Sequence, residues 1–174
     1  LYLQFDNKYL IFEDTRKFGR FFLYSNMNYL NNKLGIEPLS DDFTDNWILT
    51  NMKSKNRQIK SLLLNQSFIC GLGNIYVDEA LWHAKIHPLA ISSNISNKKL
   101  KKLREGIIKV LSSSIKLGGT TIRDYTYDYS YAGNYALNLN VFGKQGDNCT
   151  RCNTIIKKVK IVQRGTHYCP KCQQ

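Results

Sequence analysis

The chain has 174 residues, and its 25 Lys and Arg outnumber its 13 Asp and Glu, which gives a formal net charge of +12. No apolar run is long enough to cross a membrane, and no segment pairs a basic face with a strongly apolar one of the length that a surface anchor needs. Twenty of the basic residues but only six of the acidic ones lie in residues 51–174. This uneven charge favours a polyanion as the partner.

The first quarter of the chain predicts strands followed by a loop. Aromatic and aliphatic residues alternate in part over residues 2–24, with Asp6-Asn7-Lys8 as a hairpin turn. Residues 26–38 are polar and contain Gly and Pro, which is typical of a loop.

Helical patterns dominate from residue 40 onward. The spacing of apolar residues predicts helices over residues 40–52, 59–64, 75–84 and 96–117. Ser96 is the predicted N-cap of the longest helix, whose outer face is rich in Lys. Residues 120–146 show weak periodicity, and we expect a loop there.

Four of the five cysteines lie in the last 26 residues, as Cys149-x2-Cys152 and Cys169-x2-Cys172. Each Cys-x2-Cys turn can present two thiolates to one ion, and the intervening residues predict a β-hairpin that brings the turns together. The alternatives are a redox pair or two disulfides, but this spacing favours one zinc ion. Four thiolates leave no open coordination position, so the predicted role of the zinc is structural.

A second motif, Gly71-Leu72-Gly73-Asn74, separates two predicted helices and opens the second. Free N–H groups at a helix start, together with the Asn74 amide, suit a phosphate group. Lys60 could close the same cradle, and Arg164 near the turn of the zinc hairpin could reach another phosphate. The plainer interpretations are a tight interhelical turn and solvated surface side chains.

Two further pairs of residues could have a functional or positioning role. Arg16 and Phe18 lie two residues apart in an extended segment, so their side chains share one side and could wedge into a base stack. The alternative is a strand with one buried Phe. The adjacent acids Asp78 and Glu79 are interpreted as orienting their helix rather than as acid–base catalysts.

Taken in order, these motifs resemble those of the bacterial formamidopyrimidine-DNA glycosylases, over essentially the whole chain. The resemblance is carried by Asp14-x-Arg16-x-Phe18-Gly19, Gly71-x-Gly73-Asn74-Ile75-Tyr76-x-x-Glu79, Ile86-His87-Pro88, Gly118-Gly119-Thr120-Thr121-x-Arg123-Asp124-Tyr125, and the four-cysteine module ending in Tyr168-Cys169-Pro170-x-Cys172-Gln173.

The resemblance implies a mainly α fold with β elements, in three parts. Residues 1–38 would be the last strands of a β-rich N-terminal catalytic domain. Residues 39–146 would form a helix–two-turns–helix DNA-binding domain with a lesion-covering loop at 120–136. Residues 147–174 would form a β-hairpin zinc finger.

The resemblance also implies roles for single residues. Those expected to bind DNA phosphates are Lys60, Asn74, Tyr76 and Arg164. Arg16 and Phe18 would fill the gap left by a flipped base and press on the opposite base. The loop over the extruded base would use Thr121, Arg123, Tyr125, Gly133 and Tyr135. Two positions depart from the family pattern, namely Gln163 in place of Gly and Tyr135-Ala136 in place of Phe-Gln.

The implied function is base-excision repair by a DNA glycosylase and abasic-site lyase that removes oxidised purines such as 8-oxoguanine and formamidopyrimidines. The expected partner is double-stranded DNA with oxidised bases or abasic sites. We expect a monomer in the bacterial cytoplasm, associated with the nucleoid.

Family members begin with a Pro whose amine attacks the sugar and a Glu that transfers protons. This chain begins with Leu1, so we expect it to be the C-terminal part of a longer enzyme, without catalytic residues and inactive alone. The alternatives are a non-catalytic remnant that binds damaged DNA and an endonuclease VIII-like glycosylase for oxidised pyrimidines. A ribosomal or RNA-polymerase zinc ribbon fits the charge and cysteines but not the helical core.

Overall fold

The computed structural model describes residues 1–14, 17–120 and 134–174, which form two units, Leu1–Asn32 and Lys33–Gln174. Expectations for Arg16 and for the loop residues Thr121, Arg123, Tyr125 and Gly133 therefore lie outside the described residues. Over the described ranges, no helix combines the length and the apolarity that crossing a bilayer requires.

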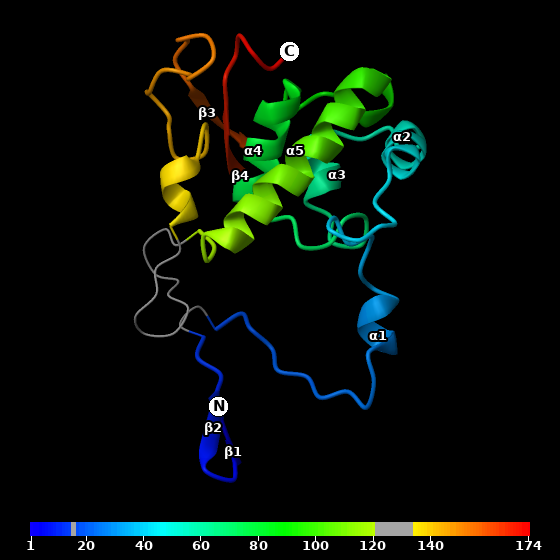
Figure 1. Cartoon of the computed structure of the whole chain (residues 1–174), viewed down its shortest axis with the longest axis vertical. Helices are drawn as coiled ribbons and strands as arrows, with labels where there is room; N and C mark the ends of the chain where they lie inside the picture. The colour runs from blue at the N-terminus through cyan, green and yellow to red at the C-terminus, as the bar shows by residue number, and fades with distance from the viewer. Residues whose placement is uncertain (15–16, 121–133) are drawn as a thin grey trace. The chain divides into compact units, whose positions relative to one another are not determined.

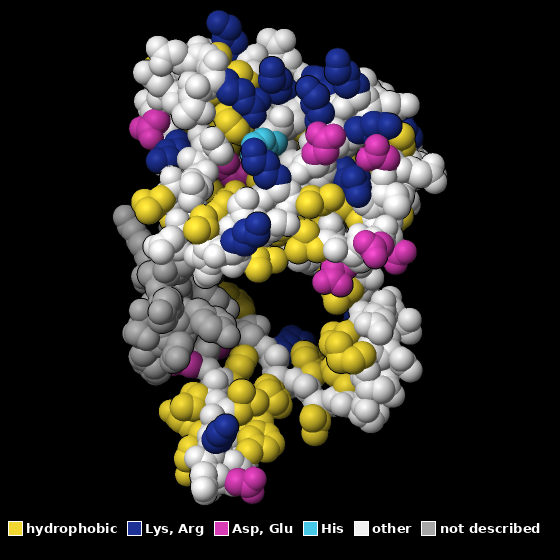
Figure 2. Space-filling model, in the orientation of Figure 1, with side chains coloured by type: hydrophobic (Ala, Val, Ile, Leu, Met, Phe, Trp, Pro, Cys, Tyr) yellow, Lys and Arg dark blue, Asp and Glu magenta, His cyan; other side chains and the backbone are white. Residues whose placement is uncertain are grey.

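The first unit is a small hairpin followed by irregular chain. Strand β1 (Tyr2–Phe5) pairs antiparallel with β2 (Lys8–Ile11), which confirms the predicted hairpin turn. The described residues from Phe12 to Tyr24 form no further strand, and a one-turn helix α1 (Asn28–Asn31) lies in the predicted loop. A two-stranded ribbon covers neither of its own faces, and its apolar side chains are exposed (Figure 2).

The second unit holds the remaining elements (Figure 1). These are α2 (Asp45–Lys53), α3 (Ile59–Leu63), α4 (Asn74–Ala84), the 3-10 turn η1 (Ser92–Asn94), α5 (Asn97–Lys116), the 3-10 turn η2 (Tyr135–Asn138), β3 (Lys157–Ile161) and β4 (Arg164–Tyr168). Each predicted helix is present. Ser96 caps α5 as expected, because its hydroxyl accepts a hydrogen bond from the Lys99 backbone N–H.

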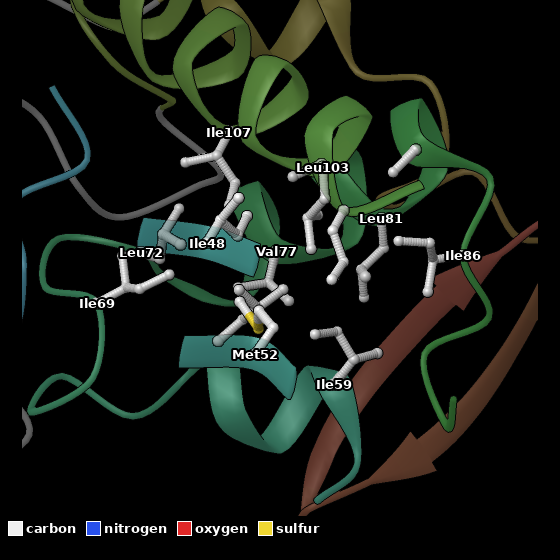
Figure 3. Close-up of a cluster of buried hydrophobic side chains, with 14 of the residues drawn as sticks. Ile48, Met52, Ile59, Ile69, Leu72, Val77, Leu81, Ile86, Leu103 and Ile107 are labelled. Carbon is white, nitrogen blue, oxygen red and sulfur yellow. The ribbon is translucent and has the colours of Figure 1, made fainter. Parts of the chain in front are cut away.

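The core lies where α4 and α5 pack against α2 and α3 (Figure 3). Its fully buried side chains include Ile48 and Met52 of α2, Ile59 of α3, Val77 and Leu81 of α4, and Leu103 and Ile107 of α5. Gly106 allows the close crossing of α4 and α5, since a Cβ there would lie 3.2 Å from the Ala80 carbonyl oxygen. This core fixes α4, whose first turn carries the Gly-Asn motif.

The last strands form the predicted hairpin. β3 pairs antiparallel with β4, and the turn is Val162-Gln163, where both residues have positive φ angles of 48° and 59°. Arg164 is therefore the first residue of β4 rather than a turn residue.

Candidate nucleic-acid interface and zinc site

The start of α4 is an open turn with room for a ligand backbone. Gly71 has a φ of +78°, and a Cβ on either Gly71 or Gly73 would meet nothing within 4 Å. The Gln66 amide holds the turn by accepting from the Gly71 N–H and donating to the Leu72 carbonyl, both at 2.9 Å. The first N–H groups of α4 carry the positive end of the helix dipole, so the turn can hold an anion.

Asn74 joins this turn to the zinc hairpin. Its Nδ2 donates to the Gly165 carbonyl oxygen at 2.9 Å, although the two residues are 91 positions apart. The neighbouring Arg164 is exposed. The structure thus brings Asn74 and Arg164 to one place, and their expected phosphate contacts stay predictions.

Lys60 is placed differently from the surface position that a phosphate ligand implies. Its side chain is fully buried, and its Nζ donates to Asp78 Oδ1 at 2.6 Å. Burial lowers the pKa of Lys60 from its ordinary value, Asp78 opposes this, and nearby Arg164 lowers it further. A phosphate contact by Lys60 stays a prediction that requires this pair to open.

Tyr76 is half-buried rather than on the open surface. Its hydroxyl forms hydrogen bonds with Ser114 Oγ at 2.6 Å and Thr120 Oγ1 at 3.1 Å. Its ring centroid is 6.1 Å from that of Tyr135, which is buried. Burial raises the pKa of Tyr135 to about 12, with Glu79 and Tyr76 adding to the rise. Tyr135 is the one predicted loop residue among the described ones.

Asp78 and Glu79 anchor parts of the chain that follow α5. Asp78 Oδ2 accepts from the His167 backbone N–H of β4 at 2.8 Å. Glu79 accepts from the backbone N–H groups of Asn140, Val141 and Phe142 at 2.8–3.0 Å. The sequence signal was an adjacent pair of acids within a predicted helix, and the long-range anchoring was missed because its partners lie 61–89 residues away.

In the first unit, Phe18 is 86% exposed. An exposed aromatic side chain is what insertion into a base stack requires of the free protein. The buried-strand alternative for Phe18 is wrong, because the side chain is exposed and the described residues around it form no strand. Insertion itself stays a prediction.

The four cysteines of the last 26 residues meet in one cluster. Their sulfur atoms lie within 4.8 Å of one another, with Cys152 and Cys169 at 3.4 Å and Cys149 and Cys172 at 4.0 Å. Sulfur atoms around a tetrahedral zinc ion are about 3.8 Å apart for Zn–S bonds of about 2.3 Å, whereas a disulfide needs about 2.05 Å. The donor set fits one structural zinc ion, and the disulfide alternative is wrong.

Two protein-family models match this chain. A family model described as the formamidopyrimidine-DNA glycosylase H2TH domain matches residues 34–126, and one described as a zinc finger found in FPG and IleRS matches residues 146–174.

Among curated relatives, the formamidopyrimidine-DNA glycosylase of Protochlamydia amoebophila is 47% identical over 169 residues, which cover 95% of this chain and 61% of the relative. That of Lactococcus lactis is 40% identical over 178 residues, which cover 100% and 65%. The chain thus spans just under two thirds of the length of these relatives.

Solved structures of formamidopyrimidine-DNA glycosylases also match this chain. The MutM (Fpg) protein of Thermus thermophilus superposes with a TM-score of 0.91 at 32% identity, covering 99% of this chain and 67% of that one. Lactococcus lactis Fpg in complex with DNA containing an abasic site gives a TM-score of 0.77 at 42% identity, covering 84% and 54%.

Proposed function

The chain belongs to the formamidopyrimidine-DNA glycosylase family, and we propose that it is the DNA-gripping part of a base-excision repair enzyme. The full enzyme would remove oxidised purines from double-stranded DNA and cleave the strand at the resulting abasic site. It would act as a monomer in the bacterial cytoplasm, at the nucleoid.

The hydrogen bond between Asn74 and Gly165 is the observation that carries this proposal. It brings the open helix start of α4 next to an exposed Arg at the head of the zinc hairpin. A DNA backbone that crosses both would meet N–H groups, an amide and a guanidinium, which are typical phosphate ligands. The basic side chains on the second unit (Figure 2) add long-range attraction.

The residues that the family resemblance singled out suggest a division of labour. Asn74 and Arg164 would hold the phosphates around the lesion, with Tyr76 and Lys60 behind them. Phe18 and Arg16 would fill the space of the extruded base. Residues 120–136 would cover that base.

We propose that these 174 residues bind DNA without forming the covalent adduct. The amine chemistry would reside in the part of the relatives that this chain does not span. The buried Lys60 is a poor substitute nucleophile, since its Nζ is enclosed and held by Asp78.

The test is borohydride trapping and gel shift on duplexes with 8-oxoguanine opposite cytosine or with an abasic analogue. We expect a shift with the 174-residue chain, and an adduct only when the chain is extended by the preceding part of a relative. An adduct with the short chain would refute the absence of a nucleophile, and no shift with either form would refute the function.

A matched pair of variants tests the grip itself. Arg164→Ala should weaken binding about tenfold or more and reduce the salt slope by about 1, since one phosphate contact is lost. Lys157→Met removes a charge from an exposed site at the far end of the same hairpin and should change binding by less than about twofold. Equal effects would mean that Arg164 contributes general charge only.

The runner-up, an endonuclease VIII-like preference for oxidised pyrimidines, is tested by the same extended chain. Adduct formation on a duplex with an oxidised pyrimidine, in place of 8-oxoguanine, would favour it.

A further inference from the structure

Trp82 connects α4 to the zinc finger rather than to the helical core. Its indole is 5% exposed and packs in a separate apolar cluster, here called the finger cluster, of Trp82, Val141, Cys149, Ile156 and Cys169. Two members of this cluster are zinc ligands. A side chain of α4 therefore lies directly behind the sulfur atoms.

Arg151, which lies inside the first Cys-x2-Cys turn, covers this indole. Its guanidinium carbon is 3.4 Å from the centroid of the Trp82 ring, and its Nη2 donates to the Trp82 carbonyl oxygen at 2.6 Å. The contact combines a stacked cation with a charge-assisted hydrogen bond. It fixes the cysteine turn on the end of α4.

Two buried donors in this contact have no acceptor. Among the described residues, no atom, sulfur included, accepts a hydrogen bond from Trp82 Nε1 or from Arg151 Nη1. Buried donors left without acceptors are costly and call for an explanation. The indole shares its buried cluster with Cys149 and Cys169, whose thiolates would carry the charge of a zinc-loaded site.

A zinc-loaded site would supply what these donors lack. Four thiolates around one Zn²⁺ carry a net charge of −2, and each sulfur keeps lone pairs that accept N–H groups. Arg151 lies between Cys149 and Cys152 in the chain and stacks on the indole that packs with Cys149 and Cys169, so both donors belong to the surroundings of the metal site.

We propose that Trp82 and Arg151 form an outer shell of the zinc site: the indole N–H and the guanidinium face the cysteine thiolates, retain the metal and dock the finger on α4. This assignment concerns how zinc is held and does not depend on the DNA activity. Neither residue is a zinc ligand, so both are positioning residues.

Outer-shell groups of metal sites change metal affinity by about 10–100-fold when they are removed. We therefore expect Trp82→Phe and Arg151→Met to release zinc to a colorimetric chelator at least about tenfold faster than the parent chain. The zinc-loaded 174-residue chain is the material, and release of the metal alone is the signal.

Two control variants make the same kinds of substitution at positions outside the proposed outer shell. Trp47→Phe alters the other Trp of the chain, which packs against Phe43 and Phe68 in the helical core. Lys171→Met removes an exposed positive charge inside the second Cys-x2-Cys turn. Both should release zinc within about twofold of the parent rate, because neither removes an outer-shell donor.

A third control separates the N–H groups from packing. Val141→Ala opens a cavity in the same finger cluster but keeps both donors. If it releases zinc as fast as Trp82→Phe, packing explains the effect and the proposal is overturned. Parent-like release by both Trp82→Phe and Arg151→Met overturns it as well.

Cobalt in place of zinc gives a readout that a purely structural role would not move. Removing an N–H group from a thiolate raises the energy of its lone pairs, so the sulfur-to-cobalt charge-transfer band should move to longer wavelength in Trp82→Phe and Arg151→Met. It should stay in place in Val141→Ala and Lys171→Met. An unmoved band in the first two would contradict the proposed N–H contacts with sulfur.

Discussion

At the scale of single residues, one carboxylate ties three parts of the second unit together. Asp78 of α4 binds Lys60 of α3 at 2.6 Å and the His167 backbone of β4 at 2.8 Å. All of these groups are buried. The same pair therefore stabilises the core and sets the position of the strand that begins with Arg164.

Removing one partner of this pair should be severe. Lys60→Met leaves the buried Asp78 charge without its cationic partner and with only the His167 backbone N–H as a donor, and we expect it to lower the free energy of unfolding by about 3–5 kcal/mol. The control is Lys101→Met, since Lys101 forms an exposed pair with Asp45 at 3.2 Å and should cost less than about 1 kcal/mol. Urea unfolding of the parent and the two variants measures this free energy. Similar losses of unfolding free energy in both variants would refute the argument.

His83 should make the chain less stable in mild acid. Burial lowers the pKa of His83 to about 4, and Lys109 and Arg151 add to this. His83 binds a proton near pH 6.5 in the unfolded chain but only near pH 4 in the folded chain. The free energy of unfolding therefore falls as pH drops from about 7 toward 4. The loss is present below the unfolded pKa and absent above it.

The corresponding measurement compares the chain with His83→Gln at several pH values. Between pH 7 and 5.5, the parent should lose about 1 kcal/mol or less relative to the variant, after allowance for partial exposure of the ring. Partial burial also lowers the pKa of His87, but that contribution is common to both chains. A pH-independent difference would show that His83 is not responsible.

At the scale of elements, the zinc hairpin contains an avoidable strain. Val162 and Gln163 both have left-handed φ angles, which a two-residue hairpin turn demands and which favour Asn and Gly. A β-branched residue is a poor choice there.

The double variant Val162→Asn/Gln163→Gly should stabilise the hairpin by about 1 kcal/mol. A thermal melt of the zinc-loaded chain at fixed metal concentration gives the measurement. Val162→Ala/Gln163→Ala shortens the same side chains without relieving the backbone and should give no gain. An equal gain from both would place the effect in the side chains.

The elements that the sequence predicted well are those with a repeated local signal. The apolar spacing and the Ser96 cap define α5, and the two Cys-x2-Cys turns define the zinc site. The start of the predicted helix over residues 40–52 was wrong, because α2 is capped by Thr44, whose hydroxyl accepts a hydrogen bond from the Trp47 N–H. The turns α1 and η2 are too short to show periodicity.

The burial of Lys60 was beyond sequence reasoning for a different reason. Its partner Asp78 lies 18 residues away on another helix, and a Lys among other basic residues resembles a solvated one. Such long-range pairing leaves no local pattern. The same holds for Asn74 and Gly165, whose meeting defines the candidate interface.

At the scale of the whole molecule, the second unit has two apolar clusters that polar contacts link. The helical core of α2–α5 is large and buried, whereas the finger cluster is small and includes zinc ligands. The links include the hydrogen bonds of Asn74, Asp78 and Glu79 with residues beyond α5, and the contact of Arg151 with Trp82. Loss of zinc should therefore affect the two clusters unequally.

Stripping zinc with a chelator should unfold residues 147–174 and leave the helical core folded. Without the metal, the finger has too little apolar surface to pay for its own ordering. Hydrogen exchange should show fast-exchanging amides in β3 and β4 and continued protection in α4 and α5. Added zinc should restore the protection of the β3 and β4 amides. Protected β3 and β4 amides in the stripped chain would show that docking on α4 alone holds the finger. Loss of protection throughout α4 and α5 would show that the core and the finger fold as one unit.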